Sequence, residues 1–568
     1  MAIGIRVVHC KAAIAGLLAL AFLSGSSLHA LFRHKPAASS AAFPILTPEQ
    51  AALLRRAAYR ERFLTQVIEQ HRPLIQTYIQ HMRPDPQLGA APISDEYLLG
   101  RIDFEGRFSQ TLYKKPAVSA GVLALPTNIL DKLTGVFRLK LTPNGFMDMM
   151  FVDSRSFDFA HYRFRFVRRE FLGSVRTWVF DVKPRPGTGK GRFIGRIWVE
   201  DQDANIVRYT GTFSGGGHLQ VYFHFDSWRG NVQPSVWLPM AVYVEDRDFR
   251  AQSYLWGYGF RLPSAAVADN QTDADEKAES AAAQSSQDLS PLAAQRAWEG
   301  QSERNVLDRL TQAGLLANPS DFDQVLETVT NNLILGSNLA LPGEVHCRVL
   351  LTTDLESLAV GNTIILSKGL IDVLPGEEDL AAMLSFQLAH ILLRHPIDTR
   401  YAFSDRLYFP DEYTLEEILM GHTAAQNQEA AAKAVDIFHA SIYADKAASV
   451  GLFLAQLTQV QPHVHALLTP RLGDSLVSAS GVPWLAAFQQ QAPALQIGNL
   501  QQIAALPLGS HLRIDPWTDE VFSLHFGPVQ LVSARDKMPF QVTPIYYRLQ
   551  RYVPPELKSS ASAPPPAQ

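Results

Sequence analysis

Cysteine is almost absent from this chain of 568 residues, which has only Cys10 and Cys347. Cys10 lies in the N-terminal segment that we expect to direct export, so the mature protein has one cysteine and no internal disulfide. We therefore interpret Cys347 as a small buried hydrophobic residue rather than a nucleophile. An excess of positive charge is also absent, because the net charge is −4, and this excludes nucleic acid from the expected partners.

Long apolar runs are missing except at the start of the chain. Arg6 and Lys11 precede an apolar run from Ala12 to Leu23, which is the pattern of a signal peptide, assigned here to residues 1–30. Alternatively, residues 12–32 are long enough to span a bilayer as an uncleaved anchor and to associate the protein with a membrane. Because no cysteine directly follows the run, a bacterial lipid anchor is not expected. We predict an exported protein, either periplasmic or anchored in the membrane and facing the periplasm.

A helix start follows this segment. Thr47 is a capping residue, Pro48 suits the first turn, and Gln50 completes a capping box. Apolar residues at roughly helical spacing extend the pattern towards Met82, so we expect one long helix there.

From about Tyr97 to Leu262 the sequence pattern is typical of β-strands. Aromatic and β-branched segments such as RFIGRIWVE, IVRYTGTF, LQVYFHFDSW and WLPMAVYVED are separated by short turns. Strands that follow one another without intervening helices predict an antiparallel, curved sheet, or half-barrel, within a domain of residues 45–263. The glycine-rich stretch Pro186–Gly191 lacks a Ser or Thr after its Lys and is predicted to be a hairpin loop rather than a phosphate loop.

The rest of the chain divides by composition. Residues 264–297 are small and polar, which predicts a disordered linker. Residues 298–470 are mainly helical in pattern, residues 471–553 contain strand patterns, and the tail 554–568 is predicted to be disordered. The fold class is therefore a multidomain α+β protein, with an N-terminal β-domain, a mainly helical domain and a small strand-rich C-terminal section.

The β-domain resembles periplasmic lipoprotein carriers and sigma-factor regulators of the LolA and RseB type, through segments such as FDVKPRP followed by GRFIGRIWVEDQDANIVRY. Those proteins fold as half-open barrels that hold acyl chains in an apolar concavity. The resemblance implies a carrier of lipid or apolar peptide. A curved aromatic sheet with an ordinary filled core is the alternative.

The helical domain contains SFQLAHILLRH, a stretch in which the metal-binding pattern H-E-x-x-H is altered to F-Q-L-A-H. The surrounding sequence resembles the zinc metallopeptidases of the HtpX, BepA and CAAX-prenyl-protease family. The resemblance covers roughly residues 300–460. The positions that match the family pattern around this helix are Glu378, Leu380, Ala381, Ala382, Leu384, Ala389, His390, Arg394 and His395.

The same resemblance implies where the zinc ligands are lost. Phe386 stands at the first histidine, Gln387 at the general base, and Asn427 at the third ligand, a glutamate in the family. A slip of two residues in that alignment would make Glu429 the third ligand instead. Phe386 offers no lone pair and Gln387 has no useful basicity, so only His390 is retained and a pseudoenzyme is expected.

His390 itself is expected to be a buried histidine with one hydrogen-bond partner, for which Glu429 is the candidate. Lys433, four residues after Glu429, could pair with Glu429 instead. His395 should point away from His390, by about 140° on a regular helix, so the two should not share a metal. His422, His439, His463 and His465 carry no motif.

Three functions remain open. The first is a catalytically inactive relative of the peptidases that acts as a binding or chaperone-like module in the cell envelope, with no cofactor. The second is an active zinc metallopeptidase with a non-standard site, such as His390 with Glu429 and a distant histidine. The third is a carrier of lipid or apolar peptide that uses the β-domain. The expected partners are an envelope protein, an apolar peptide or a lipid.

Overall fold

The protein is described by a computed structural model over most of its length. The described residues are 45–85, 89–103, 109–112, 149–153, 156–189, 191–214, 224–246, 248–258, 291–341, 343–397, 420–496, 502, 508, 512–514, 520–523, 540–544 and 546–552. The export segment, most of the predicted linker and the C-terminal tail lie outside these residues, and so do the predictions made for them. Within the described part, no helix is both long and apolar enough to cross a membrane.

The first element is helix α1, Pro48–Ile68, which begins where the sequence predicts. The Thr47 hydroxyl accepts a hydrogen bond from the Gln50 amide at 3.2 Å, and the Gln50 side chain accepts one from the Thr47 amide at 2.9 Å. Together these two bonds form the expected capping box.

The expected extension of this helix to Met82 is wrong, because Leu74–Asp85 forms strand β1 instead. Pro73 has no amide hydrogen and biases Arg72 towards an extended conformation, so the helical pattern cannot cross this point. The residues after Pro73 include Thr77, Tyr78 and Ile79, whose β-branched and aromatic side chains favour a strand.

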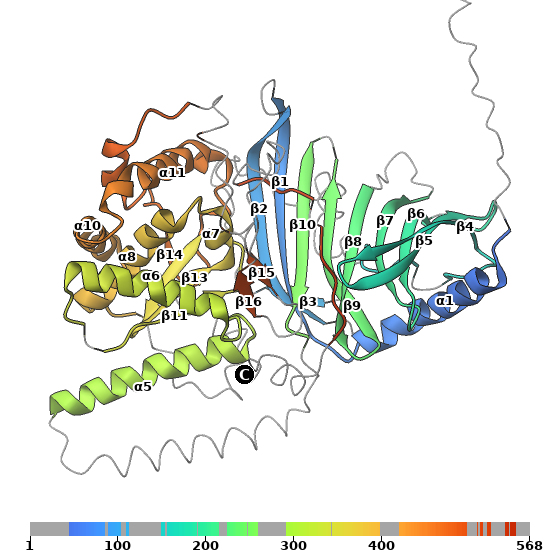
Figure 1. Ribbon diagram of the computed structural model, residues 1–568, viewed down its shortest axis with the longest axis horizontal. Helices are drawn as coiled ribbons and strands as arrows, with labels where there is room; N and C mark the ends of the chain where they lie inside the picture. Colours follow the sequence, from blue (N-terminus) through green and yellow to red (C-terminus); the bar gives the residue numbers. More distant parts are fainter. Residues whose placement is uncertain are drawn as a thin grey trace, which may run out of the picture. The chain divides into compact units, whose positions relative to one another are not determined.

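Ten antiparallel strands form one open sheet, in the order β3-β2-β1-β10-β9-β8-β7-β6-β5-β4 (Figure 1). The sheet is curved and does not close, because the end strands β3 and β4 do not pair with each other. This confirms the predicted antiparallel β-domain. Its strands are β1 (Leu74–Asp85), β2 (Gly89–Asp103), β3 (Ser109–Leu112), β4 (Tyr162–Leu172), β5 (Val175–Pro184), β6 (Phe193–Glu200), β7 (Ile206–Phe213), β8 (His224–Gln233), β9 (Val236–Glu245) and β10 (Phe249–Trp256).

Helix α1 packs on one face of this sheet, which we call the α1 face. Its buried residues, such as Leu54 and Ile68, lie in one apolar cluster with buried residues from nine of the ten strands. Inside this cluster Arg229 of β8 forms a two-pronged ion pair with Glu61 of α1, at 2.7 and 2.9 Å. The carboxylate of Glu61 also accepts a hydrogen bond from the Val152 amide at 2.8 Å.

The opposite face of the sheet is covered in part by the C-terminal segment 540–552. The Val542 amide donates to the Gln80 side chain at 2.7 Å, and the Tyr552 amide donates to Asn231 at 3.0 Å. Leu549 is buried in a cluster on this face. Residues 540–544 and 546–552, which sequence composition separates from the β-domain, therefore pack on its sheet.

The helical domain is built around a four-stranded sheet of order β11-β13-β12-β14 (Figure 1). Strands β11 and β13 run parallel, and the others pair antiparallel. Its helices are α5 (Pro291–Gln312), α6 (Asp321–Ser337), α7 (Lys368–Val373), α8 (Glu377–Leu393), α10 (Ala424–His439) and α11 (Ala447–Val460), and its 3-10 turns are η1 (Ala444–Lys446), η2 (Gln461–His463) and η3 (Ala486–Gln491). The strands are β11 (His346–Leu350), β12 (Glu356–Val360), β13 (Thr363–Ser367) and β14 (Asp474–Ser475), and a separate pair consists of β15 (Leu512–Ile514) and β16 (Val521–Ser523).

Among the described residues of the C-terminal section, β14 belongs to the sheet of the helical domain, and β15 and β16 form the separate pair. Helix α5 begins at Pro291, inside the range predicted as linker. Cys347 is 1% exposed on β11, and burial raises the pKa of its thiol to about 12. The interpretation of this cysteine as a buried apolar residue is confirmed.

The helical domain and the large sheet share one apolar core, which contains Leu74 and Leu99 of the sheet. Asp95 of β2 accepts hydrogen bonds from the amides of Ala466 and Leu467, both at 2.8 Å. Contacts of this kind join parts of the chain that the sequence separates by a linker.

Candidate functional site

The altered motif lies on α8, the most buried helix of the domain. Its residues from Asp379 to Ile391 are all buried, which confirms the expectation that His390 is a buried histidine. His390 is 1% exposed, and the ring of Phe386 meets its imidazole edge-on at 4.9 Å between centroids. Gln387 donates a hydrogen bond to the Ser357 hydroxyl at 2.8 Å, so the residue at the base position is tied to the neighbouring strand β12.

His395 lies beside His390, and the expectation that it points away is wrong. Helix α8 ends at Leu393, and Arg394 takes a left-handed conformation with φ 54°. This cap folds the chain back, so the His395 amide donates to the His390 carbonyl at 3.1 Å. The Nδ1 atoms of the two imidazoles are then 3.0 Å apart.

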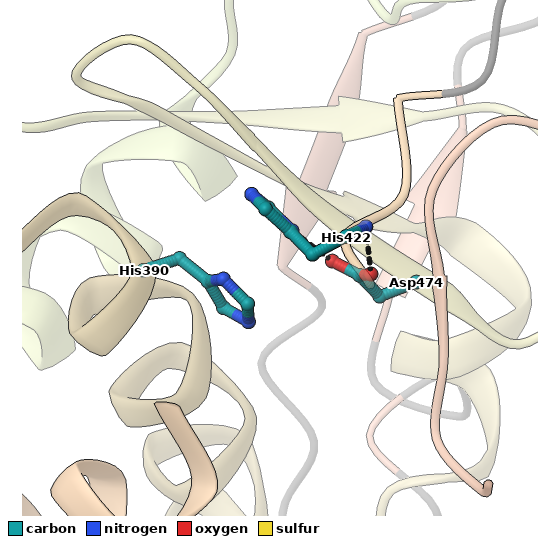
Figure 2. Close-up of side chains that lie close together, drawn as sticks. All are labelled: His390, His422 and Asp474. Carbon is teal, nitrogen blue, oxygen red and sulfur yellow. Dashed lines mark hydrogen bonds and ion pairs between the residues drawn. The ribbon is translucent and has the colours of Figure 1, made fainter. Parts of the chain in front are cut away.

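His422 and Asp474 complete the cluster from outside the helix. His422 directly precedes the N-cap of α10, and Asp474 lies on β14. The carboxylate of Asp474 accepts from the His422 amide and pairs with His422 Nδ1, both at 2.7 Å (Figure 2). The imidazole of His422 stacks on that of His390, with 3.8 Å between centroids and 25° between planes.

Two glycines allow this approach. A side chain on Gly421 would come within 2.8 Å of the Gly473 carbonyl oxygen, and one on Gly473 within 2.6 Å of the Ser357 carbonyl oxygen. The backbone bond from the Met420 amide to the Leu472 carbonyl, 2.9 Å long, holds the two segments in this register. Close backbone packing at Gly421 and Gly473 therefore places His422 beside Asp474.

Asn427 lies at the site, whereas Glu429 does not. Asn427 is 5% exposed and donates from Nδ2 to Asp474 at 3.2 Å. The side chain of Glu429 is 65% exposed and lies 3.5 Å from His395 Nε2. The prediction that Glu429 is the hydrogen-bond partner of His390 is thus wrong, because Glu429 faces outward on α10 and contacts His395 instead.

Burial and neighbouring charge set the protonation of the cluster. Burial, and then the adjacent His422, lower the pKa of His390 to about 3, so its imidazole is neutral at pH 7. Burial and His422 also lower the pKa of His395. Burial alone would raise the pKa of Asp474, but the hydrogen bonds from His422 outweigh it and hold that pKa below its usual value. The site therefore combines the neutral imidazole of His390 with a buried carboxylate.

Three residues could hold a metal ion. His390, His422 and Asp474 each offer one ligand atom, and these atoms all lie within 4.8 Å of one another. Sequence reasoning missed His422 and Asp474, because they are 52 positions apart and belong to no motif. The nearest signal in the sequence is the pair of glycines, Gly421 and Gly473, each directly preceding one of them.

No family model matches this chain, and no curated protein matches it. A solved LolA superfamily protein from Nitrosomonas europaea is similar to it at 13% identity and a TM-score of 0.19, over 38% of this chain and 94% of that one. A DUF1329 family protein from Desulfovibrio piger has 9% identity and a TM-score of 0.20, over 37% and 95% of the two chains. An outer membrane lipoprotein-sorting protein domain from Vibrio parahaemolyticus has 10% identity and a TM-score of 0.18, over 38% and 98%. At these TM-scores none of the three similarities carries a conclusion about this chain.

Proposed function

We propose that this protein is an exported binding protein that holds an apolar ligand, either an acyl chain of a lipid or an apolar peptide, on the α1 face of its large sheet. The observation that carries the proposal is the set of aromatic rings on that face, which continues from a buried core to partly exposed side chains near the edge strand β4. A non-catalytic helical domain fits this reading.

The aromatic rings of the α1 face pack against one another rather than singly. Phe164 is buried and meets Phe159 at 5.0 Å between centroids, and Phe180 is buried and meets Phe166 at 5.7 Å. Phe159 and Phe166 are themselves only partly buried, although they pack against the apolar cluster. An apolar ligand that covered these two rings would extend a surface that is already largely out of water.

Cations lie over the same rings. The guanidinium of Arg169 is 3.7 Å from the centre of the Trp178 ring, and that of Arg55 is 5.9 Å from the centre of Phe159. The side chain of Arg169 is 54% exposed, so it remains accessible to a ligand. An acyl chain that ends in a carboxylate or phosphate would meet both the apolar rings and these cations, which favours a lipid over an uncharged peptide.

In the described part of the helical domain, the two positions at which the peptidase pattern has a zinc ligand and a general base hold Phe386 and Gln387. Gln387 cannot take a proton from water, and its side chain is engaged with Ser357. Phe386 fills its position with a ring that has no lone pair. We propose that this domain supports the binding protein without catalysing hydrolysis, and that export places both domains in the cell envelope.

The test is the binding of a fluorescent polyene fatty acid by the full chain, followed by titration of fluorescence. Phe166→Asp places a charge among the exposed rings, and we expect it to weaken probe binding by about tenfold or more. Leu335→Asp is the matched control, because Leu335 is an apolar residue of α6 that is 78% exposed in the other domain. It should leave binding unchanged.

Two further measurements complete the test. An apolar peptide without acidic groups is added as a competitor, and native mass spectrometry is used to detect lipid that copurifies with the chain. Equal probe binding by the wild type and Phe166→Asp, with the variant folded by circular dichroism, would refute the proposed site. Displacement by the peptide but by no lipid would show that the ligand is a peptide.

A further inference from the structure

We propose that His390, His422 and Asp474 form a binding site for a divalent transition metal ion, for which Zn²⁺ is the best match. The site joins the end of α8, the segment before α10 and strand β14 (Figure 2). It differs from the motif of the resembled peptidases, since two of its three residues lie outside that motif.

The first argument is the set of polar atoms that lack a partner. Within the described residues, His390 Nε2 and His422 Nε2 are buried without a hydrogen bond of normal geometry, although the Asn427 side chain lies near His390 and favours its charged form. Leaving such an atom unpaired in a protein interior is costly, so buried polar atoms are almost always paired. Two unpaired imidazole nitrogens beside one carboxylate indicate a bound ion that would satisfy both.

The second argument is the way in which His422 is held. Asp474 pairs with Nδ1 of His422 and accepts from its backbone amide, while Asn427 donates to the same carboxylate. A carboxylate that accepts the Nδ1 proton fixes the tautomer in which Nε2 carries the lone pair. His422 is thus presented in the form that binds a metal, with Asp474 as the group that orients it. Asp474 can itself reach the ion as third ligand only if the ring of His422 turns.

The third argument is the chemistry of the donors. Two imidazoles and a carboxylate suit Zn²⁺ and related first-row ions, whereas Ca²⁺ and Mg²⁺ take mainly oxygen ligands. The side chains of His422 and Asp474 are 0% and 1% exposed, so an ion would be enclosed by protein. His395 lies against His390 Nδ1, which leaves Nε2 of His390 as its metal-binding atom.

Binding must change one feature of the cluster. A metal lies in the plane of each imidazole that ligates it, and two rings stacked at 3.8 Å cannot both meet this condition. One ring therefore turns, and the stack between His390 and His422 is lost. This movement gives the proposal a spectroscopic signature, because the ring protons of the two histidines shift together on metal addition.

The site is expected to be structural or regulatory rather than hydrolytic. An ion held by these three residues would tie together segments that are far apart in the sequence, including a β14 strand of only two residues, Asp474–Ser475. Gln387, at the position of the general base, has no basicity with which to activate a bound water.

The experiment treats the purified full chain with a chelator, removes the chelator, and titrates Zn²⁺ by calorimetry at pH 7.5, with metal content measured after dialysis. We expect one tightly held Zn²⁺ per chain. Co²⁺ in place of Zn²⁺ should give the intense visible bands of a four-coordinate site.

Variants assign the ligands. His390→Ala and His422→Ala should each weaken Zn²⁺ binding by about a hundredfold or more, and Asp474→Asn by about tenfold or more, as for a ligand or a group that orients one. His346→Ala is the matched control, because the His346 side chain is 56% exposed at the edge of the same sheet. It should bind Zn²⁺ like the wild type.

Three results would overturn the proposal. The first is that the wild type retains less than about one tenth of an equivalent of Zn²⁺. The second is that both histidine variants bind Zn²⁺ with unchanged affinity, and the third is that His346→Ala loses as much affinity as they do. If His390→Ala fails to fold by circular dichroism, His390→Gln replaces it, because the amide keeps a polar group of similar length at the position.

Discussion

A buried polar cluster of the sheet domain and one of the helical domain differ in how completely their atoms are hydrogen-bonded. In the sheet domain, Glu61 and Arg229 are buried but pair through two hydrogen bonds, and both make further bonds to backbone groups. In the helical domain, His390 and His422 are buried with their Nε2 atoms unpaired among the described residues. In the first arrangement only Arg229 Nε is left without a hydrogen-bond partner, whereas in the second the Nε2 atoms of both imidazoles are.

This difference indicates that the ion pair has a structural role and that the histidine cluster is a candidate binding site. A satisfied buried pair holds α1 on its sheet and needs nothing from solution. A buried cluster with several unpaired acceptors is stable only if the rest of the domain supports it or if a ligand completes it. The histidine cluster is therefore the part of the molecule where added metal should change stability, and the Glu61–Arg229 pair is the part where mutation alone should.

The largest expected effect comes from breaking the pair. Glu61→Ala leaves the guanidinium of Arg229 buried without its carboxylate, and we expect the free energy of unfolding in urea to fall by about 3–5 kcal/mol. Glu49→Ala is the control, since Glu49 is 74% exposed and 3.8 Å from Arg169, and it should cost less than about 1 kcal/mol. Replacing both partners, in Glu61→Met with Arg229→Met, should recover most of the loss. A cost in Glu61→Ala no larger than in the control would show that the pair does not hold α1.

A lone buried carboxylate, Asp379 near the start of α8, gives the next largest effect. Burial, and then the neighbouring Glu378, raise the pKa of this group to about 7, above the unfolded value of about 3.8. The folded state therefore binds the extra proton, so this contribution to stability is complete below about pH 4 and is lost as pH rises through 7. The loss is at most about 4 kcal/mol, since the shift is about three pH units.

Asp379→Asn tests this effect. It should flatten the fall in unfolding free energy between about pH 4 and pH 7, and it should be more stable than the wild type at pH 8. Asp436→Asn is the control, because it makes the same change at a carboxylate that is exposed on α10. A variant that is less stable than the wild type at pH 8 would mean that the charged carboxylate is favourable at this helix end.

Metal addition should produce a smaller change, confined to the helical domain. At a free Zn²⁺ concentration one hundred times the dissociation constant, the wild type should gain about 2.7 kcal/mol, measured by thermal unfolding with and without a chelator. Glu61→Ala should gain the same amount, because the two sites have no residue in common. His422→Ala should gain little. An equal gain in His422→Ala would place the metal elsewhere.

Much of the sheet domain could be predicted from local sequence, and the exceptions have local causes. Thr47 and Gln50 predict the start of α1, and the aromatic segments predict β6 to β9, because caps and alternation act over a few residues. Strand β1 was missed because its apolar residues also fit a helix, and only Pro73 shows that the helix must end before it.

The site could be predicted only where it lies on one helix. The burial of His390 follows from the apolar residues around it on α8. His395 could not be placed, because its position depends on the left-handed turn at Arg394, after which helical geometry no longer applies. His422 and Asp474 meet through backbone packing at Gly421 and Gly473, and contacts between distant segments leave no periodic signal in the sequence.

The smallest expected effect comes from the capping box, a motif that begins a helix in each domain. Thr47 with Gln50 caps α1, and Thr423 with Gln426 caps α10 through the same reciprocal hydrogen bonds. Thr47→Ala and Thr423→Ala should each lower the free energy of unfolding by about 1 kcal/mol in the presence of a chelator, since each exposed cap loses its side-chain bond to the helix. Thr47→Ser and Thr423→Ser, which keep the hydroxyl, are the controls. Only Thr423→Ala should also weaken Zn²⁺ binding, because Thr423 directly follows His422 and fixes the segment that carries it. If both alanine variants bind Zn²⁺ like the wild type, the position of His422 does not depend on the cap of α10, and the packing of Gly421 against Gly473 is sufficient to hold it.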